Sequence, residues 1–251
     1  MTENIIKILL LDIETAPNLA YVWGLFEQNV AINQIADVSY VMCWAAKWHG
    51  EKEVMFDSVR KSGPKKMLER IHKLLCEADV VVHYNGMKFD IPTLNKEFLI
   101  HKMSPPSPYR QVDLLRVSRG TFKFQSHKLD YVSQQLGLGS KLKHTGFQLW
   151  IDCMENKRAA WSSMEKYNKQ DVILLEKVYE KFRPWIKNHP NHGLYDGVEC
   201  CPRCAGTNIQ ARGKARTKAV TYQRYQCKDC GSWFKGDKDI THVKPKFSEV
   251  I

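Results

Sequence analysis

Runs of consecutive apolar residues alternate along the chain with segments whose apolar positions recur every three to four residues. The runs predict buried strands and the periodic segments predict amphipathic helices. Strand-like runs occupy residues 5–13, 38–47, 52–57 and 79–84, with a weaker one at 109–115. Helical patterns occupy residues 64–77, 91–102, 127–137 and 162–186. Three strands followed by helix, strand and helix indicate an α/β fold, with a mixed sheet flanked by helices.

The regular pattern ends near residue 186. The next segment, KNHPNHGLYDGVE at 187–199, is rich in Pro, Gly and Asn and has no period, so it is predicted to be a linker. From Cys200 to the last residue there are eleven Lys or Arg against four acids, a formal charge of +7. The predicted organisation is therefore a domain at 1–188, a linker at 189–199, a small module at 200–236 and a tail at 237–251.

Composition narrows the class of protein. The chain has 251 residues, of which 43% are hydrophobic, and a formal net charge of +11. This is a globular composition, and the basic charge favours a polyanionic partner. Nucleic acid is favoured over a membrane, because no lipidation motif or amphipathic Lys-rich helix is present. The first residues lack both a long apolar run and a secretion signal, so we expect a cytoplasmic protein.

Acidic residues follow two of the predicted strands and lie on the last predicted helix. In the stretch ILLLDIETAP, Asp12 and Glu14 point to the same side of the strand, near its end. Asp90 follows another apolar strand and begins a helix, where it could also act as a cap. Tyr167 and Asp171 are four residues apart and share one helix face. Each acid alone could be a surface or capping residue.

Taken together, these motifs resemble the DnaQ-like, or DEDD, 3′-5′ exonuclease superfamily, which has a ribonuclease H-like fold. The first motif is DIET with Asp12 and Glu14, and the second is HYNGMKFD with Asn85 and Asp90. The third is YNKQD, whose Tyr167 stands four residues before its Asp and indicates the tyrosine subgroup. The resemblance extends over residues 5–185.

The resemblance implies a set of roles. Asp12 would bridge two Mg²⁺ or Mn²⁺ ions, Glu14 and Asp171 would complete the site on the nucleophile side, and Asp90 would serve the leaving-group side. Tyr167 would orient the attacking water. Such hard cations prefer carboxylate oxygens, so Asp12 and Glu14 at the end of LLLDIE are expected to pair with metal rather than with Lys or Arg.

Other polar residues have open alternatives. Asn85 could contact a nucleotide or cap the following turn. The basic loop 141–144, with Lys143, could contact phosphate or simply be solvated. Asp113 is expected to make a structural hydrogen bond, and His83 is expected to be a hydrogen-bonded residue at a strand end.

Five of the eight Cys lie in the last fifth of the chain. CPRC and CKDC form two C-x₂-C pairs with the spacing of a zinc ribbon, which predicts one structural Zn²⁺ held by four thiolates. The predicted ligands are Cys201, Cys204, Cys227 and Cys230. Cys200 gives no two-residue gap and is predicted to be spare, and His189 and His192 are less suitable because the Cys₄ site is already complete.

The segment between the Cys pairs mixes cations with aromatic residues, which suits phosphate contacts and base stacking. The candidates for nucleic-acid binding are Arg212, Lys214, Arg216, Tyr222 and Arg224. The sequence thus predicts a DNA exonuclease of a phage or bacterium with a DNA-binding zinc ribbon. An RNA-directed or structure-specific nuclease and a catalytically inactive binding module are the alternatives.

Overall fold

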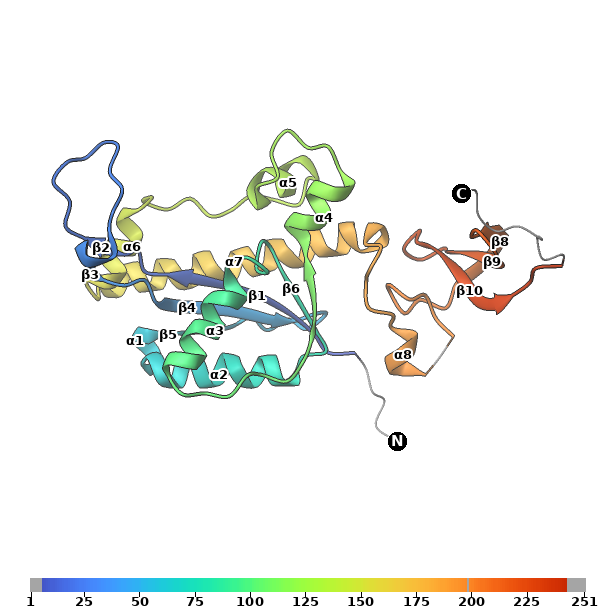
Figure 1. Cartoon of the computed structure of the whole chain (residues 1–251), viewed down its shortest axis with the longest axis horizontal. Helices are drawn as coiled ribbons and strands as arrows, with labels where there is room; N and C mark the ends of the chain where they lie inside the picture. Colours follow the sequence, from blue (N-terminus) through green and yellow to red (C-terminus); the bar gives the residue numbers. More distant parts are fainter. Residues whose placement is uncertain (1–5, 198, 243–251) are drawn as a thin grey trace. The chain divides into compact units, whose positions relative to one another are not determined.

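The computed structural model describes residues 6–197 and 199–242 (Figure 1). The chain forms two compact units. Residues 7–179 make up the first, and the described residues from Glu180 onward, with Ile6, make up the second. No described helix is long and apolar enough to span a membrane.

A five-stranded sheet is the centre of the first unit, with the strand order β5-β4-β1-β6-β7. β1 pairs antiparallel with β4 and parallel with β6, so the predicted mixed sheet is confirmed. β4 and β5 are antiparallel, and β6 and β7 are parallel. The strands are β1 (Ile8–Thr15), β4 (Val41–Trp48), β5 (Met55–Ser58), β6 (Val80–His83) and β7 (Arg110–Asp113).

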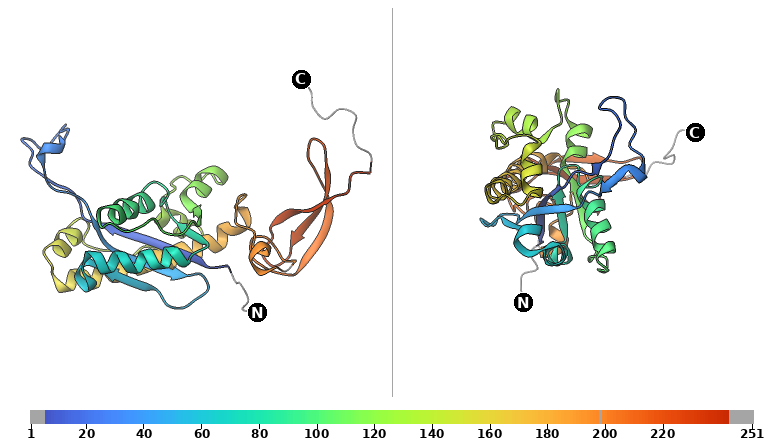
Figure 2. Two further views of the ribbon diagram at one scale, coloured as in Figure 1. Left: turned by 60° about the horizontal axis from the view of Figure 1, so that its bottom comes forward. Right: turned by 90° about the vertical axis from the view of Figure 1, so that its left-hand side faces the viewer.

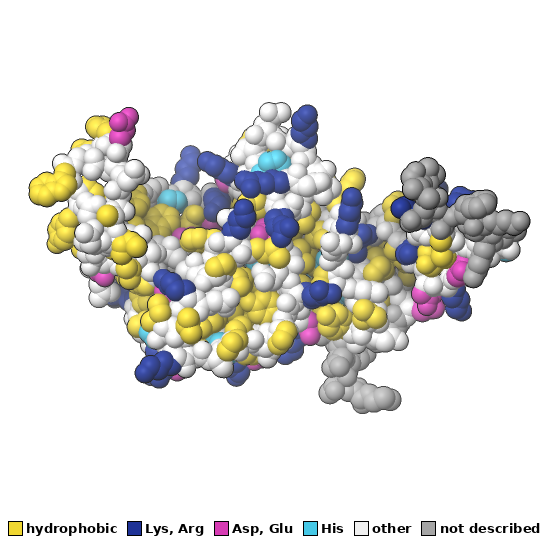
Figure 3. All heavy atoms as spheres, in the orientation of Figure 1, with side chains coloured by type: hydrophobic (Ala, Val, Ile, Leu, Met, Phe, Trp, Pro, Cys, Tyr) yellow, Lys and Arg dark blue, Asp and Glu magenta, His cyan; other side chains and the backbone are white. Residues whose placement is uncertain are grey.

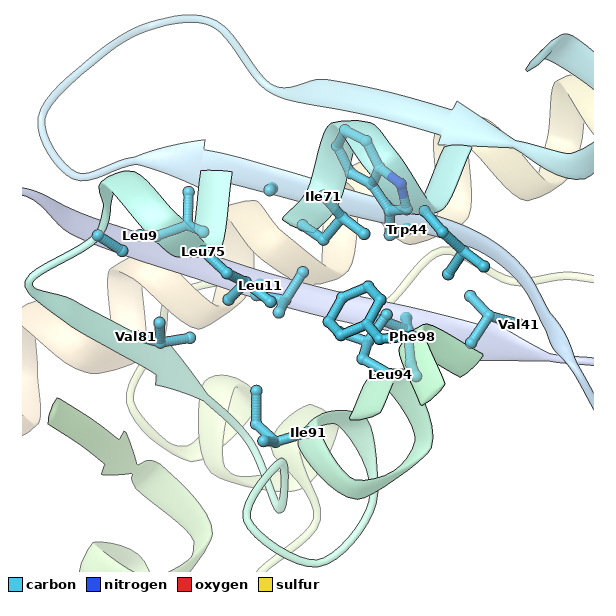
Figure 4. Packing of buried hydrophobic residues seen from close by; sticks show 14 of the residues in the cluster. Leu9, Leu11, Val41, Trp44, Ile71, Leu75, Val81, Ile91, Leu94 and Phe98 are labelled. Atoms are coloured by element: carbon cyan, nitrogen blue, oxygen red, sulfur yellow. The ribbon is translucent and has the colours of Figure 1, made fainter. Parts of the chain in front are cut away.

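Helices cover both faces of the sheet (Figure 2). α2 (Pro64–Glu77) and α3 (Asp90–Ile100) pack on one face, and α7 (Arg158–Phe182) lies on the other. The odd-numbered residues of β1, namely Leu9, Leu11 and Ile13, belong to the core beneath α2 and α3 (Figure 4). Because side chains alternate along a strand, the even-numbered Asp12 and Glu14 point to the face of α7.

Several elements match the predicted ranges and others were not predicted. α2 has the predicted bounds and begins with Pro64, a residue favoured in the first helical turn. α7 begins four residues earlier and ends four residues earlier than predicted. The elements of the first unit that the pattern did not predict are α1 (Val59–Ser62), α4 (Leu114–Thr121), α6 (Gln148–Met154) and, between β1 and β4, β2 (Leu19–Ala20), β3 (Ile35–Asp37) and the 3₁₀ turn η1 (Ile32–Gln34). α5 (Leu129–Gln135) lies inside the predicted range 127–137.

Residues 17–39 leave the sheet directly after β1 and return at β4, and we name them the arm (Figure 1). Among the described residues, nine of the nineteen exposed large hydrophobic side chains belong to the arm. Hydrophobic side chains appear at several places on the arm in the space-filling view (Figure 3). The nine are Leu19, Tyr21, Val22, Trp23, Leu25, Phe26, Val30, Ile32 and Val38. The arm has two acids, Glu27 and Asp37, and no Lys or Arg.

The second unit contains a three-stranded antiparallel sheet with the order β10-β9-β8. Its elements are η2 (Arg183–Trp185), α8 (Gly193–Asp196), β8 (Ile209–Arg216), β9 (Thr221–Cys227) and β10 (Trp233–Asp239). We name residues 200–242 the C-terminal module. α8 lies within the predicted linker, and β10 extends three residues beyond 236. Residues 243–251 of the predicted tail lie outside the described residues, and the domain boundaries stay a prediction.

Candidate active site and cysteine cluster

Three acids from two elements meet on the α7 face of the sheet. Carboxylate oxygens of Asp12 and Glu14 on β1 and of Asp171 on α7 lie within 4.8 Å of one another. Asp171 is 1% exposed. Its Oδ1 atom is buried and has no hydrogen-bond partner among the described residues. A buried carboxylate oxygen without a donor is costly, and a cation is the group that would satisfy it.

Asn168 is a site residue that the sequence analysis missed. It is fully buried, and its Nδ2 donates to Asp12 Oδ2 over 2.6 Å. This amide fixes the orientation of the Asp12 carboxylate from the facing helix. The signal in the sequence is that Asn168 interrupts an apolar helix stripe of Met164, Val172 and Leu175, all three of which are buried.

Asp90, the last residue of the second motif and the first residue of α3, is 3% exposed. Its Oδ1 accepts a hydrogen bond from the backbone N–H of Ile13 over 3.2 Å. The pairing of β6 with β1 ends at Leu10. The N–H of Ile13 lies beyond this pairing, and the Asp90 side chain accepts its hydrogen bond. Phe89 is the N-cap of α3 and Asp90 lies in the first turn, so the favourable position at a helix N-terminus and the contact with β1 hold together. Asp90 lies outside the group of three mutually close carboxylates.

The turn that leads from β6 to Asp90 has a fixed geometry. Asn85 has a φ of 71°, and its backbone N–H donates to Asp113 Oδ1 over 3.0 Å. Gly86 packs against His83, since a Cβ at this glycine would lie 2.3 Å from His83 Cγ. Asp113 also accepts the N–H of Leu115 in the first turn of α4. The structural role expected for Asp113 and the buried, hydrogen-bonded state expected for His83 are confirmed.

Lys141 binds the acidic site directly. Its Nζ lies 2.5 Å from Asp171 Oδ2 and 3.1 Å from the hydroxyl oxygen of Tyr167. The sequence indicated Lys141 only as part of a basic loop, so this pairing with Asp171 was not predicted. The physical reason is that the loop before α6 lies against α7, so an ammonium group reaches a buried carboxylate that needs a countercharge.

Burial and mutual repulsion disfavour the charged forms of the acids. Burial raises the pKa of Asp12, and the charges of Glu14, Asp90 and Asp171 raise it further. Burial and Asp171 raise the pKa of Glu14 to about 8, while burial raises that of Asp90 to about 7. Burial also raises the pKa of Asp171, although the Lys141 ammonium opposes this. One ammonium does not offset four acids, so the site favours binding of a further cation.

These pKa shifts predict how stability depends on pH. A raised pKa means that the folded state holds its proton more tightly than the unfolded state, so this contribution is lost as the pH rises through the folded pKa. Without added divalent cation, we expect the Tm to fall by at least a few degrees between about pH 5 and pH 8. Differential scanning calorimetry would measure this.

Mg²⁺ or Mn²⁺ should restore more stability at pH 8 than at pH 6, because metal binding requires the deprotonated carboxylates. The Glu14→Gln variant should show a shallower fall with pH, since it removes one titrating group. A Tm that rises from pH 5 to pH 8 in the wild-type protein without divalent cation would contradict the raised pKa values.

Tyr167 lies between the acids and a basic hollow. Its ring contacts His144 and Trp150 edge-on, with centroid distances of 4.8 and 6.0 Å. A hollow of about 420 Å³ lies beside it and is lined by Leu142, Lys143, His144, Thr145, Leu149, Ser163, Lys166 and Tyr167. Lys143 is exposed. Other Lys and Arg side chains gather around acidic ones on the upper side of this unit in Figure 3.

The second cluster consists of the four cysteines of the C-terminal module. Sγ atoms of Cys201, Cys204, Cys227 and Cys230 lie within 4.8 Å of one another. The Cys201–Cys230 and Cys204–Cys227 sulfur distances are both 3.7 Å. A tetrahedral zinc with bonds of about 2.3 Å requires roughly 3.8 Å between sulfurs. The residues after the second Cys of each pair, Ala205 and Gly231, have positive φ values of 59° and 78°, which turn the backbone around the sulfurs.

One side of the C-terminal module carries cations stacked on aromatic rings. The guanidinium carbons of Arg212 and Arg224 lie 5.6 and 5.0 Å from the Trp233 ring centroid. Lys235 Nζ lies 3.8 Å from the Tyr222 ring centroid. Lys235 is opposite Arg224 in the β9–β10 register, and Tyr222 and Trp233 are two residues away from them, so these side chains share a side. We name these five residues the cationic face.

Three members of the cationic face were predicted from the sequence, whereas Trp233 and Lys235 were not, because both follow the second Cys pair. Lys214 and Arg216, which were also predicted, are exposed on β8. They follow an irregularity in the β8–β9 register at Ala211–Lys214.

The fold and the buried acids define an α/β protein with an RNase H-like nuclease fold. A family model of the RNase_H superfamily matches residues 9–183, well over half of the chain, and the chain therefore belongs to this superfamily. A search of the curated proteins found no match.

Among solved structures, the chain is similar to the family B DNA polymerase from the hyperthermophilic archaeon Pyrobaculum calidifontis. The TM-score is 0.54 at 16% sequence identity, and the match covers 72% of this chain but 25% of the polymerase chain. At this identity the match supports the shared fold.

Proposed function

We propose that the protein is a metal-dependent 3′-5′ exonuclease of the DnaQ-like tyrosine subgroup that hydrolyses phosphodiester bonds in DNA. The observation that carries the proposal is the convergence of the half-buried Asp12 and Glu14 with the buried Asp171, within 4.8 Å on the α7 face of the sheet. Tyr167 lies one helical turn before Asp171, and Asp90 follows the neighbouring strand. Similarity to a DNA polymerase supports DNA as the substrate.

The donor set fits a pair of Mg²⁺ or Mn²⁺ ions. Asp12, Glu14, Asp90 and Asp171 offer only carboxylate oxygens, and one of these is buried without a donor among the described residues. When bound, such ions neutralise charge on the phosphate and activate water for in-line displacement. Asn168 orients Asp12 for this task, and the turn held by Asp113 positions Asp90.

The chain's own groups act on the reacting atoms. The Tyr167 hydroxyl orients the attacking water, and Lys141, which reaches both Tyr167 and Asp171, supplies positive charge beside the phosphate. The hollow beside Tyr167, with Lys143 and Lys166 in its lining, accommodates the terminal nucleotide.

Tyr167→Phe should lower the single-turnover rate by roughly 10²-fold, the scale of a lost orienting or proton-transfer group. Substrate affinity should change little, because the ring contacts with His144 and Trp150 remain. Rapid-quench kinetics with separately measured binding would test this. A fall in affinity at an unchanged rate would show that Tyr167 serves as a stacking residue instead.

The C-terminal module supports a role in holding the substrate. Its four sulfurs have the spacing of a zinc site, and one structural Zn²⁺ would stabilise a module too small to fold on its own core. The cationic face offers guanidinium groups for phosphates together with aromatic rings. We infer a zinc ribbon that binds nucleic acid while the first unit cleaves it.

Parallel digestion of 3′-labelled and 5′-labelled DNA and RNA, with Mg²⁺ or Mn²⁺, tests the proposal. Release of labelled mononucleotides from 3′-labelled DNA alone is the expected result. Faster digestion of RNA would change the substrate assignment. Absence of nucleotide release from every substrate would indicate a binding module.

A further inference from the structure

A hollow of about 660 Å³ lies within the second unit, beside β10. Two exposed tryptophans line it, Trp185 at 59% exposure and Trp233 at 43%. The remaining lining residues are Glu180, Lys181, Arg183, Pro184, Asp229, Cys230 and Gly231. Its volume falls inside the range of small-ligand sites.

Arg203 joins the two walls of the hollow. Its Nε donates to the Ile186 carbonyl over 2.8 Å, and its Nη1 donates to the Trp233 carbonyl over 3.1 Å. Ile186 directly follows η2, which contains Trp185. The second carbonyl is that of Trp233 itself. A charged side chain therefore ties together the two backbone segments that carry Trp185 and Trp233.

The lining has two acids, Glu180 and Asp229, and two cations, Lys181 and Arg183. The positive charge that a polyanion requires therefore comes from the adjoining cationic face. Trp233 is also part of the cationic face, with Arg212 and Arg224 stacked on it. Glu180, one of the two acids in the lining, pairs with Arg183, at 2.9 Å between Oε2 and Nη2. Phosphates can thus follow the cationic face while bases meet the indoles.

We propose that this hollow is a base-binding site for single-stranded nucleic acid, with Trp185 and Trp233 as stacking residues and Lys181 as a phosphate contact. Bases within a duplex are stacked on their neighbours and have no free face for an indole, so the site selects single strands. The proposal rests on the proposed function and adds the strand state of the substrate and residues that the sequence did not indicate.

Fluorescence anisotropy with the full-length zinc-loaded protein, without added Mg²⁺ or Mn²⁺, tests the proposal. The probes are labelled oligothymidylate, an abasic oligonucleotide of equal length, and a duplex. Trp185→Ala should weaken binding of oligothymidylate on the order of tenfold and leave binding of the abasic strand nearly unchanged. Trp23→Ala is the matched control, since Trp23 is fully exposed on the arm, and it should have no effect.

Trp233→Ala should act in the same direction, provided that its zinc content equals that of wild type. Equal losses of affinity for the base-bearing and abasic strands, or no loss in Trp185→Ala, would overturn the proposal. The binding measurement and the cleavage assay can fail separately. If Trp185→Ala lost affinity only for the base-bearing strand and the wild-type protein cleaved nothing, the base-binding site would stand and the exonuclease assignment would be rejected. If the wild-type protein cleaved DNA and Trp185→Ala bound both strands normally, the exonuclease assignment would stand and the base-binding site would be rejected.

Discussion

Asp12→Asn should abolish exonuclease turnover, with a fall in kcat of about 10³-fold or more. Several kcal/mol of transition-state stabilisation from metal ions depend on this carboxylate, and each 1.4 kcal/mol corresponds to roughly tenfold in rate. The fold should survive, because Asn keeps the shape of the side chain. The Tm should be equal or higher, since the substitution removes one of four acids whose charges repel one another.

Asp37→Asn is the matched control for Asp12→Asn. It makes the same chemical change at an exposed acid of the arm and should leave kcat unchanged. Activity would be followed by release of 3′-terminal label and stability by calorimetry. Turnover near the wild-type rate in Asp12→Asn would reject the catalytic assignment of the acidic site, and an equal loss in both variants would point to a general effect of charge.

Cys227→Ser should release the zinc and unfold the C-terminal module. In small zinc domains, metal binding supplies about 10–16 kcal/mol of apparent free energy, and little else holds the fold. Affinity for single-stranded DNA should fall at least tenfold at low salt. The slope of log K against log salt should become shallower by about 0.7 for each phosphate that the variant no longer binds.

Cys200→Ser is the control here, because Cys200 adjoins the cluster but is outside the group of four sulfurs. It should retain one zinc per chain and wild-type affinity. Metal analysis, amide hydrogen exchange over β8–β10 and a salt series on both variants would give the comparison. Unchanged affinity and slope in zinc-free Cys227→Ser would assign nucleic-acid binding to the first unit alone.

The central sheet could be predicted from the sequence because its strands are nearly continuous apolar runs. β1 and β6 are buried on both faces, and the only acids in β1 are the two that mark the site. α2 was predicted with its bounds because a Pro begins it and its apolar face has a clear period. Local pattern and tertiary burial agree in these elements.

The partners of the acids were harder to predict. Asn168 binds Asp12 from 156 residues away along the chain, and Lys141 comes from a loop without periodicity. Both contacts depend on how α7 and that loop lie against the sheet, which propensity does not encode. Asp171 was predicted from a short motif, but that motif carries no signal for its ammonium partner, which lies 30 residues away along the chain.

The arm shows the limit of the rule that apolar residues are buried. Its apolar density is comparable with that of a core strand, yet Trp23 is fully exposed and Ile32 is 88% exposed. The arm leaves the sheet between two of its strands, and the side chains named here remain in water.

This exposure gives the chain two surfaces with opposite responses to the solution. Added salt screens the Lys and Arg of the C-terminal module and weakens their attraction to phosphate. The arm has no cation to screen, and strongly hydrated anions such as sulfate or phosphate strengthen the association of its side chains with any apolar surface. The ionic composition of the medium therefore shifts the balance between polyanions, which contact the cationic face, and apolar surfaces, which contact Trp23 and its neighbours.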